Sequence, residues 1–254
     1  MQPRTHQKEA VDACIAALED SPRAQIHMAC GSGKTFVAAL ARQKMAARTV
    51  VFLAPTIKLC EQASRLFEPT RPASSALMFV CSPNDPRIQG VQPSTDVDAI
   101  ADRLRDVGQV EIFSTYASAA ALGSALRLAG RNVDLAIGDE AHRSAGDARR
   151  RYSQWLRDST LACDKRLSMT ATPRFVNGGF ADQKIYSMDD FDAFGDVAFQ
   201  YPFAAAVADG VVSDIDALIA LAETGQDEPS LTELLAAKAQ AVAYDRIQIN
   251  KDRV

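Results

Sequence analysis

The chain has 254 residues, of which 47% are hydrophobic and 24% are charged. This length and composition allow one large domain, or one domain and part of another, around a sizeable buried core. The formal net charge is −4, so no overall positive field attracts a polyanion, and any contact with nucleic acid must be local.

The sequence also argues against a membrane or secreted protein. No apolar run reaches the roughly 20 residues of a transmembrane helix, and the first residues lack the apolar stretch of a secretory signal. The five cysteines form no Cys-x-x-Cys pair, which disfavours a zinc site or a disulfide framework. We therefore expect a cytoplasmic protein that does not contact a membrane.

Helical periodicity and short apolar runs alternate along the chain, beginning with an amphipathic helix over residues 4–20. Buried strands are expected over residues 24–29, 49–54, 76–81, 109–114, 133–138 and 165–170. Helices are expected between them, over residues 34–46, 57–67, 95–106, 116–129 and 145–158. Strands buried on both faces and separated by helices predict an α/β fold with a mostly parallel sheet and helices on both faces.

Other segments are less regular. Turn-forming residues predict loops over 82–94 and 223–230, and the aromatic residues between 191 and 203 are expected to pack a hairpin-like tail. A strand is expected over residues 215–221 and a helix over residues 231–244.

Residues 28–35 read Met-Ala-Cys-Gly-Ser-Gly-Lys-Thr and lie between an expected strand and an expected helix. Gly31 and Gly33 let the backbone curl so that successive N–H groups face an anion, and the helix start adds its positive dipole end. Lys34 is expected to reach the β and γ phosphates of ATP, and Thr35 to place its hydroxyl on Mg²⁺.

Cys30 and Ser32 complete this predicted phosphate-binding loop, in which the backbone of Cys30 matters more than its sulfur. The general form of the loop has glycine where this chain has Met28. The shorter form Ala-x-x-Gly-x-Gly-Lys-Thr does match, and the strand–loop–helix context is the required one.

An acidic pair, Asp139-Glu140, follows the expected strand 133–138. Asp139 is expected to hold Mg²⁺ through its water shell, and Glu140 to orient and polarise the attacking water as a general base. Acidic pairs at strand ends are common, so neither this pair nor the loop is decisive alone. Together, in this order, they predict a nucleotide-hydrolysing site of the motor type.

The order of the motifs resembles the first RecA-like motor domain of superfamily 2 helicases and translocases, over residues 4 to about 220. Residues 139–142 resemble its DEAH motif, and residues 168–174, Ser-Met-Thr-Ala-Thr-Pro-Arg, resemble its motif III. DEAH followed by Arg143 and this motif III looks most like the restriction-enzyme type III subunit-like group, whose members are mostly DNA motors.

The resemblance implies further roles. Arg4-x-x-Gln7 looks like the element whose glutamine reads adenine, so both residues join the expected ATP site. His142, Ser168 and Thr170 would link the nucleotide site to the nucleic-acid groove.

The resemblance, through segments similar to motifs Ia and Ib, also implies that four residues at strand ends or helix starts hold nucleic-acid phosphates without reading bases: Pro55, Thr56, Ser114 and Thr115. The alternative is that these positions only cap helices. DNA is favoured over RNA as the partner.

Superfamily 2 motors use two RecA-like domains, and the second supplies an arginine that stabilises the transferred phosphoryl group. The chain after Thr172 is too short for a second domain of similar size. We therefore expect the first domain over residues 1–212, and a linker with the partial start of a missing second domain over residues 213–254. Such a fragment, alone, would bind ATP–Mg²⁺ weakly and hydrolyse it slowly or not at all.

Alternatives remain open at this point. The chain can instead be a non-motor, ATP-dependent nucleic-acid-binding switch or regulatory module, or a truncated inactive product, whereas a small-molecule kinase is disfavoured. The run Arg149–Arg151 is either a basic patch or a solvated helix face. His6 and His27 are expected to be ordinary solvent or strand histidines, and Trp155 to pack in the core or against a partner.

Overall fold

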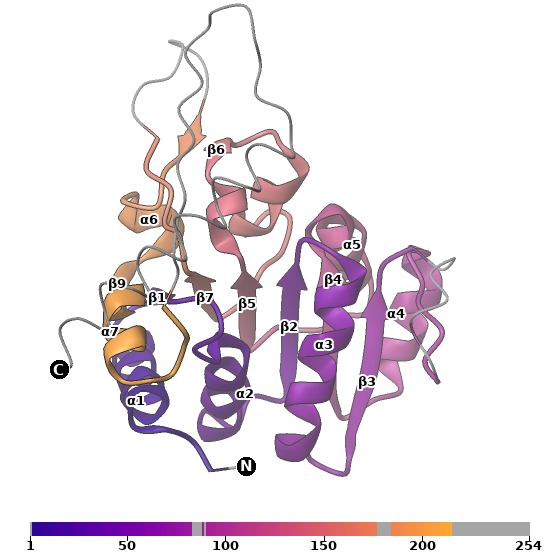
Figure 1. Cartoon of the computed structure of the whole chain (residues 1–254). Coiled ribbons are helices and arrows are strands. Elements are labelled where there is room, and N and C mark those ends of the chain that lie inside the picture. Colours follow the sequence, from indigo (N-terminus) through magenta and orange to yellow (C-terminus); the bar gives the residue numbers. More distant parts are fainter. Residues whose placement is uncertain (1, 83–87, 89, 177–183, 215–254) are drawn as a thin grey trace, which may run out of the picture. The chain divides into compact units, whose positions relative to one another are not determined.

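The computed structural model describes residues 2–82, 88, 90–176 and 184–214 (Figure 1). The chain divides into two units, Met1–Val212 and Ser213–Val254, and nearly all of the second lies outside the described residues. The same is true of three predicted segments, the strand 215–221, the loop 223–230 and the helix 231–244. The predicted partial second domain over 213–254 therefore stays a prediction.

Seven strands form one sheet in the order β3-β4-β2-β5-β7-β1-β9, and every pair of neighbours in it is parallel. The strands are β1 Arg23–Met28, β2 Thr49–Ala54, β3 Ser75–Val80, β4 Gln109–Thr115, β5 Leu135–Asp139, β7 Lys165–Thr170 and β9 Asp196–Tyr201. Two short strands, β6 Gly146–Asp147 and β8 Ile185–Tyr186, form a separate antiparallel pair. The predicted α/β fold with a mostly parallel sheet is confirmed.

Helices cover both faces of the sheet (Figure 1). One face carries α1 Thr5–Asp20, α2 Lys34–Lys44 and α3 Ile57–Phe67, and the other carries α4 Val97–Arg105 and α5 Ala119–Leu128. The short helices are α6 Phe191–Phe194, α7 Phe203–Ala208 and the 3₁₀ segments Glu68–Thr70, Tyr116–Ser118, Ala141–Ser144 and Arg151–Leu156. Each face buries its own hydrophobic cluster, which is the arrangement that holds a central parallel sheet.

Local chemistry sets several helix ends. The Thr56 hydroxyl accepts a hydrogen bond from the Leu59 N–H at 3.3 Å, and the Asp96 carboxylate accepts one from the Ala99 N–H at 2.8 Å. Both are N-caps that satisfy otherwise unpaired amides at a helix start. The predicted helix 34–46 ends earlier, at Lys44, because the backbone at Ala46 turns to φ 52°.

The predicted helix over 145–158 is wrong. This stretch forms β6, a turn and the 3₁₀ segment Arg151–Leu156. Gly146 has φ 118°, and the Asp147 carboxylate accepts a hydrogen bond from the Arg149 N–H at 2.8 Å. An aspartate that binds the amide two residues on favours a turn over a helix, so the helical pattern does not begin until after this point.

The predicted hairpin-like tail over 191–203 is also wrong. This segment contains α6, β9 and the start of α7, and β9 adds to the edge of the main sheet, parallel to β1. Gly195 makes the close approach possible, because a Cβ at this position would lie 2.1 Å from the Arg23 carbonyl oxygen. The partner strand lies some 170 residues earlier in the chain, at a sequence separation that local pattern does not reveal.

A buried ion network joins helix α2 to strand β4. Glu111 is 1% exposed and pairs with the guanidinium of Arg42, which is 3% exposed, and with Arg71, whose Nε lies 2.5 Å from Glu111 Oε2. Arg42 and Arg71 also donate to the Thr70 and Ser64 carbonyl oxygens, at 2.8 and 3.1 Å. Because the charges are desolvated, removing the shared carboxylate leaves Arg42 buried without a counter-charge.

We expect Glu111→Ala to lower the free energy of unfolding by about 3–5 kcal/mol, measured by urea denaturation at pH 7. Asp102 is the matched control, because it pairs with Arg105 but its side chain is 73% exposed. Asp102→Ala should change the stability by less than about 1 kcal/mol. Equal losses in the two variants would contradict the structural importance of the buried network.

Candidate nucleotide-binding site

The predicted phosphate-binding loop lies between the end of β1 and the start of α2. Gly31 and Gly33 both adopt the left-handed backbone, with φ values of 78° and 93°. At Gly33 a side chain is also excluded by space, because a Cβ would lie 2.3 Å from Gln7 Nε2. The two glycines therefore give the loop the curled shape that turns consecutive N–H groups toward an anion.

Lys34 is the first residue of α2 and is 8% exposed. Its Nζ donates to the carbonyl oxygens of Met28 and Ala29 at 3.2 and 3.4 Å, and no described residue forms an ion pair with it. An ammonium group held only by loop carbonyls keeps its charge available for a phosphate. Thr35 follows at the helix start and is half-buried.

The remaining loop residues differ in exposure. Cys30 is exposed, whereas Ser32 is 1% exposed and its hydroxyl donates to the Ala29 carbonyl oxygen at 2.7 Å. Ser32 thus braces the turn with its side chain. The structure brings every predicted residue of the loop together in one continuous curve between β1 and α2.

Helix α1 contacts the loop from behind. Gln7 Nε2 donates to the Ser32 carbonyl oxygen at 3.0 Å, and Gln7 Oε1 accepts from the Arg4 N–H at 3.0 Å. His6 Nε2 donates to the same Ser32 oxygen at 3.0 Å, and His6 is 6% exposed. The prediction that His6 is an ordinary solvent or strand histidine is therefore wrong, and only its position beside Gln7 offered a signal in the sequence.

The acidic pair ends strand β5. Asp139 is 7% exposed, and burial, followed by the charge of Glu140, raises the pKa of its carboxyl from 3.8 to about 6. The Lys34 charge opposes this rise in the pKa. The loop after β1 and the Asp139 carboxylate lie near one another because β7 is the only strand between β1 and β5.

Glu140 turns the chain out of the strand. Its φ is 53°, which is uncommon for a residue other than glycine, and its side chain is half-buried. Strained backbone of this kind gathers at functional sites, where the surroundings hold it in place. The Tyr116 hydroxyl supports the turn by donating to the Asp139 carbonyl oxygen at 2.7 Å.

Strands β5 and β7 are neighbours, and their ends carry the predicted coupling residues. His142 Nδ1 hydrogen-bonds with Thr170 Oγ1 at 2.9 Å and lies 3.4 Å from both Glu140 Oε2 and Thr172 Oγ1. Burial lowers the pKa of His142; the charges of Arg143, Arg174 and Lys34 lower it further, whereas that of Glu140 opposes them. The imidazole is therefore neutral at physiological pH.

Ser168 is not part of this contact. It is fully buried on β7 beside Gly138 of β5, and its Oγ has no hydrogen-bond partner among the described residues. Gly138 has no room for a Cβ, which would lie 2.4 Å from the ring of Trp155. Trp155 is fully buried and donates to Ser144 Oγ at 2.8 Å, so of the two predicted places for it, the core or a partner-facing surface, the structure shows the core.

The four predicted nucleic-acid contacts lie at the ends of β2 and β4, which pair so that Ala54 is opposite Thr115. Thr56 is exposed and caps α3, Pro55 is buried, and Thr115 is half-buried with its hydroxyl 3.1 Å from that of Ser118.

Ser114 departs from the prediction. It is fully buried, and its hydroxyl donates to the carbonyl oxygen of Val80 at 3.0 Å. A hydroxyl satisfied within the sheet does not reach a nucleic-acid phosphate, so the Ser114 side chain is removed from the expected contacts.

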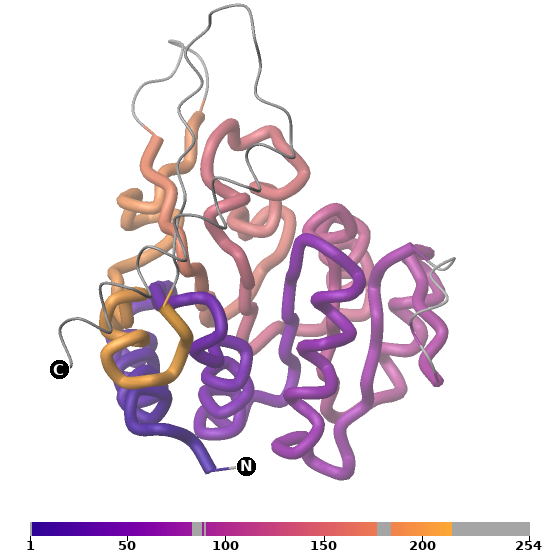
Figure 2. Tube along the Cα trace, in the orientation of Figure 1, coloured from indigo at the N-terminus to yellow at the C-terminus, as the bar shows by residue number. Residues whose placement is uncertain are grey.

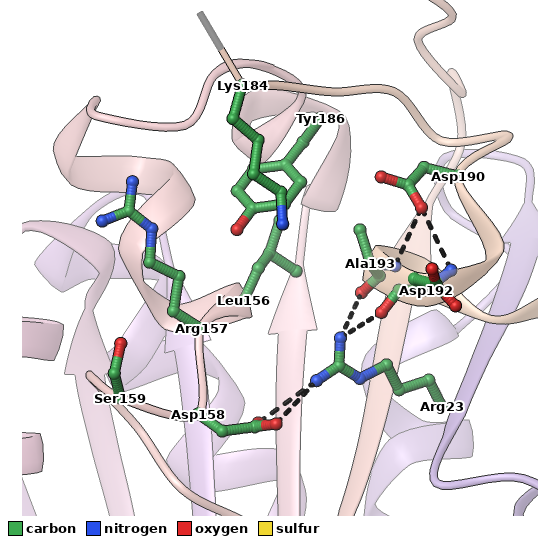
Figure 3. Close-up of a pocket in the computed structure, with 10 residues that line it drawn as sticks. All are labelled: Arg23, Leu156, Arg157, Asp158, Ser159, Lys184, Tyr186, Asp190, Asp192 and Ala193. Atoms are coloured by element: carbon green, nitrogen blue, oxygen red, sulfur yellow. Dashed lines mark hydrogen bonds and ion pairs between the residues drawn. The ribbon is translucent and has the colours of Figure 1, made fainter.

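A separate pocket of about 370 Å³ contains none of the predicted site residues (Figure 3). Arg23 crosses it, with its guanidinium on the Asp158 carboxylate at 3.1 Å and on the carbonyl oxygens of Asp192 and Ala193. These contacts tie the start of β1 to α6 and satisfy the charge internally. The exposed run Arg149–Arg151 lies in the turn and the 3₁₀ segment after β6, and not on an α-helix face.

Comparison with known proteins identifies the family. A family model described as "Type III restriction enzyme, res subunit" matches residues 1–175, more than half of the chain. The chain belongs to this family. The resemblance to superfamily 2 motors, and to the restriction-enzyme group within them, is thereby confirmed.

The chain is 29% identical to "Probable helicase A859L" of African swine fever virus over 239 residues, 92% of this chain and 26% of the viral protein. It thus spans about a quarter of the length of the curated relatives it matches.

Among solved structures, a nuclease-deletion mutant of the Type ISP restriction-modification enzyme LlaGI, in complex with a DNA substrate mimic, matches with TM-score 0.70 and 25% identity. The match covers 83% of this chain and 21% of LlaGI. The Hef helicase domain of Pyrococcus furiosus matches with TM-score 0.53 and 20% identity, over 79% of this chain and 38% of that one, which supports the fold alone.

The family implies use of a nucleotide and, typically, of Mg²⁺, and the site fits both. The left-handed glycines and the ammonium held by carbonyls suit a phosphate. The buried Asp139 beside Glu140 has a raised pKa that a divalent cation would lower. In the part of the chain that the structure describes, no helix is long and apolar enough to cross a bilayer.

The raised pKa of Asp139 predicts a pH dependence of stability in EDTA, without nucleotide. Between about pH 4 and pH 6 the folded protein keeps a proton that the unfolded chain loses, so the Asp139 contribution to stability falls as the pH rises. The substitution Asp139→Asn removes the free-energy cost of ionising this buried carboxyl. The variant should be more stable than wild type by about 1–3 kcal/mol at pH 7, and the difference should vanish near pH 4.

Urea denaturation between pH 4 and pH 8 measures this difference. Glu19→Gln, which removes an exposed carboxylate on α1, serves as the control and should show no comparable pH-dependent gain. An Asp139→Asn difference that is constant with pH, or a variant less stable at pH 7, would contradict the assigned burial effect.

Proposed function

We propose that this chain is the ATP-binding and ATP-hydrolysing motor domain of a DNA-dependent helicase or translocase. The observation that carries the proposal is the convergence of Lys34, Asp139 and Glu140 at the ends of nearby parallel strands. Lys34 has no described ion-pair partner, and burial and Glu140 raise the pKa of Asp139. The positive charge of Lys34 is suited to a phosphate, and the carboxylate of Asp139 is suited to a divalent cation.

Each residue has a defined task in this proposal. The backbone N–H groups of the loop, from Cys30 to Lys34, bind the phosphates, and Lys34 leaves the loop carbonyls to contact the outer phosphates. Thr35 and Asp139 hold Mg²⁺, which neutralises phosphate charge when bound. Glu140 orients the attacking water and accepts its proton.

Nucleotide and nucleic acid would communicate through the ends of β5 and β7. His142 contacts both Glu140 and Thr170, so a change at the catalytic carboxylate alters the contacts of motif III. The buried Ser168 hydroxyl on the same strand has no hydrogen-bond partner among the described residues and is available for a new one after such a change. We propose that His142, Ser168 and Thr170 couple the nucleotide site to the nucleic-acid site. We also propose that Gln7 and Arg4 bind the adenine end of ATP.

DNA is proposed as the partner because the LlaGI structure is described in complex with a DNA substrate mimic. Thr56 and Thr115 provide amides and hydroxyls at adjacent strand ends, which can hold phosphates in spite of the net negative charge. Turnover also needs the arginine that family members supply from a second RecA-like domain. No segment of this sequence matches it, so we expect the 254-residue chain alone to hydrolyse ATP slowly.

The site residues are tested by separating binding from turnover. Lys34→Ala should weaken binding of a fluorescent ADP–Mg²⁺ analogue at least 10-fold because the phosphates lose their cation. Glu140→Gln should keep binding within about threefold of wild type but reduce phosphate release about 100-fold or more.

Lys44→Ala is the control, because this exposed lysine lies on the same helix and pairs only with Asp12 among the described residues. If Lys34→Ala and Glu140→Gln both behave as Lys44→Ala does, the proposed site is wrong. If ATP changes DNA affinity while DNA has no effect on phosphate release, a regulatory switch replaces the motor as the better proposal.

The DNA contact is tested at Thr56 with two substitutions that both preserve the helix cap. Asparagine and aspartate cap helices equally well, but only aspartate adds a charge. We therefore expect Thr56→Asp to weaken duplex DNA binding at least fivefold relative to Thr56→Asn at about 0.05 M salt, with equal melting temperatures. Equal DNA affinities of the two variants would exclude a phosphate from this position, and the same pair measured with RNA tests the choice of nucleic acid.

A further inference from the structure

The phosphate-binding loop has a second support, at residues 201–212, which no sequence motif indicated. This segment comprises Tyr201 at the end of β9, helix α7 and the residues up to Val212, and it ends the first unit of the chain. Figure 2 follows it in orange, near the indigo first helix. Three separate contacts join it to the loop or to α1.

The first contact is an aromatic stack. The rings of Tyr201 and His6 are nearly parallel, with their planes 3° apart and their centroids separated by 4.3 Å. Both residues are 6% exposed, so the stack is shielded from water. His6 in turn donates to the Ser32 carbonyl oxygen at 3.0 Å, which carries the contact into the loop.

The Ser32 carbonyl matters because of peptide geometry. In a trans peptide the C=O of Ser32 and the N–H of Gly33 point in opposite directions. Two donors, from His6 and Gln7, hold this oxygen on the side of α1. They thereby hold the Gly33 N–H on the opposite side of the same peptide, and a rotated peptide would leave two buried donors unpaired.

The second contact is a backbone hydrogen bond, from the Ala29 N–H to the Tyr201 carbonyl oxygen at 2.9 Å. Tyr201 therefore holds the loop both through its ring and through its main chain. Its hydroxyl donates to Asp209 Oδ2 at 2.7 Å, just after the end of α7. The hydroxyl thus points to the end of α7, whereas the ring and the main chain contact α1 and the loop.

The third contact comes from the way α7 ends. Gly210 has φ 65°, its N–H donates to the Val207 carbonyl oxygen at 2.9 Å, and the Val211 N–H donates to the Ala206 carbonyl oxygen at 2.8 Å. This pair of bonds is a Schellman ending, which reverses the chain after a helix. The reversal places the Val212 side chain against Gly31 of the loop. The approach is close, because a Cβ added at Gly31 would lie 3.3 Å from Val212 Cγ1.

We propose that His6 and Tyr201 are positioning residues, which set the shape of the phosphate-binding loop and couple it to the segment 201–212 where the chain leaves the first unit. Nucleotide bound at the loop stabilises this segment, and loosening the segment weakens nucleotide binding, because coupling between two sites is reciprocal. The coupling to nucleotide rests on the proposed function, whereas the support of the loop does not.

Four variants separate the contacts. Tyr201→Leu and His6→Ala remove the stack, His6→Phe keeps an aromatic ring but loses the bond to Ser32, and Tyr201→Phe keeps the ring and loses only the bond to Asp209. Tyr201→Phe is thus the matched control for the stack. Hydrogen–deuterium exchange of the nucleotide-free protein measures the loop directly, in peptides that cover residues 28–36.

We expect Tyr201→Leu, His6→Ala and His6→Phe each to raise exchange in residues 28–36 at least fivefold, and Tyr201→Phe to leave it within twofold of wild type. The same three variants should weaken binding of the fluorescent ADP–Mg²⁺ analogue between about 5-fold and 100-fold. In wild type, ADP–Mg²⁺ should slow exchange in residues 203–212, and His6→Ala should abolish this protection even at saturating nucleotide.

The inference would be overturned if His6→Phe and Tyr201→Leu exchanged residues 28–36 and bound nucleotide as wild type does. It would also be overturned if nucleotide did not slow exchange of residues 203–212 in the wild-type protein. Peptides of β2 and β4 report whether a variant is folded, and His6→Phe tests the bond to Ser32 if Tyr201→Leu does not fold. A wild type that binds no nucleotide refutes the proposed function and the coupling, while the nucleotide-free exchange still decides whether the stack supports the loop.

Discussion

The site is organised around two buried charges that the protein does not neutralise by pairing them. The Lys34 ammonium is held by carbonyl oxygens, and the Asp139 carboxyl is buried beside a second carboxylate, so that its pKa rises to about 6. A protein that needed these residues only for stability would be better served by an ion pair or by apolar side chains. The arrangement stores an unfavourable electrostatic free energy that a ligand carrying phosphate and a divalent cation can release.

Everything around these charges restricts their movement. Lys34 lies on a helix whose first peptide is oriented by α1 through the Ser32 carbonyl, and Asp139 ends a strand fixed by β7 on one side and β2 on the other. Preorganisation of this kind is the main way in which a protein contributes to phosphoryl transfer, because the reaction asks for positioning and charge more than for covalent help. In the proposed function, the parallel sheet is therefore part of the mechanism as well as the scaffold.

The sequence was sufficient where local patterns carry the information. The loop glycines, the acidic pair and the six predicted strands depend on short motifs or apolar runs, and the strands begin and end within one or two residues of the predicted positions. The helix predicted over 145–158 failed for a local reason, the turn at Asp147, but three other failures share one physical cause, which is that a distant partner decides the outcome. Strand β9 pairs with β1, His6 stacks on Tyr201, and the Ser114 hydroxyl bonds to Val80, and none of these partners is near in the sequence.

The two consecutive carboxylates illustrate how a fold gives different tasks to adjacent residues. Asp139 is the last residue of a strand buried on both faces, and its environment is dry. Glu140 adopts a left-handed backbone, a strain that costs about 1–3 kcal/mol. This conformation turns the Glu140 side chain out of the strand to its half-buried position beside His142. The turn is held by the Tyr116 hydroxyl on the Asp139 carbonyl and by the Arg143 N–H on the Glu140 carbonyl at 3.0 Å. A relaxed backbone would direct the Glu140 side chain elsewhere, so the strain at this residue separates the buried Asp139 carboxyl from the half-buried Glu140 carboxylate beside His142, which is the separation that the proposed division of tasks requires.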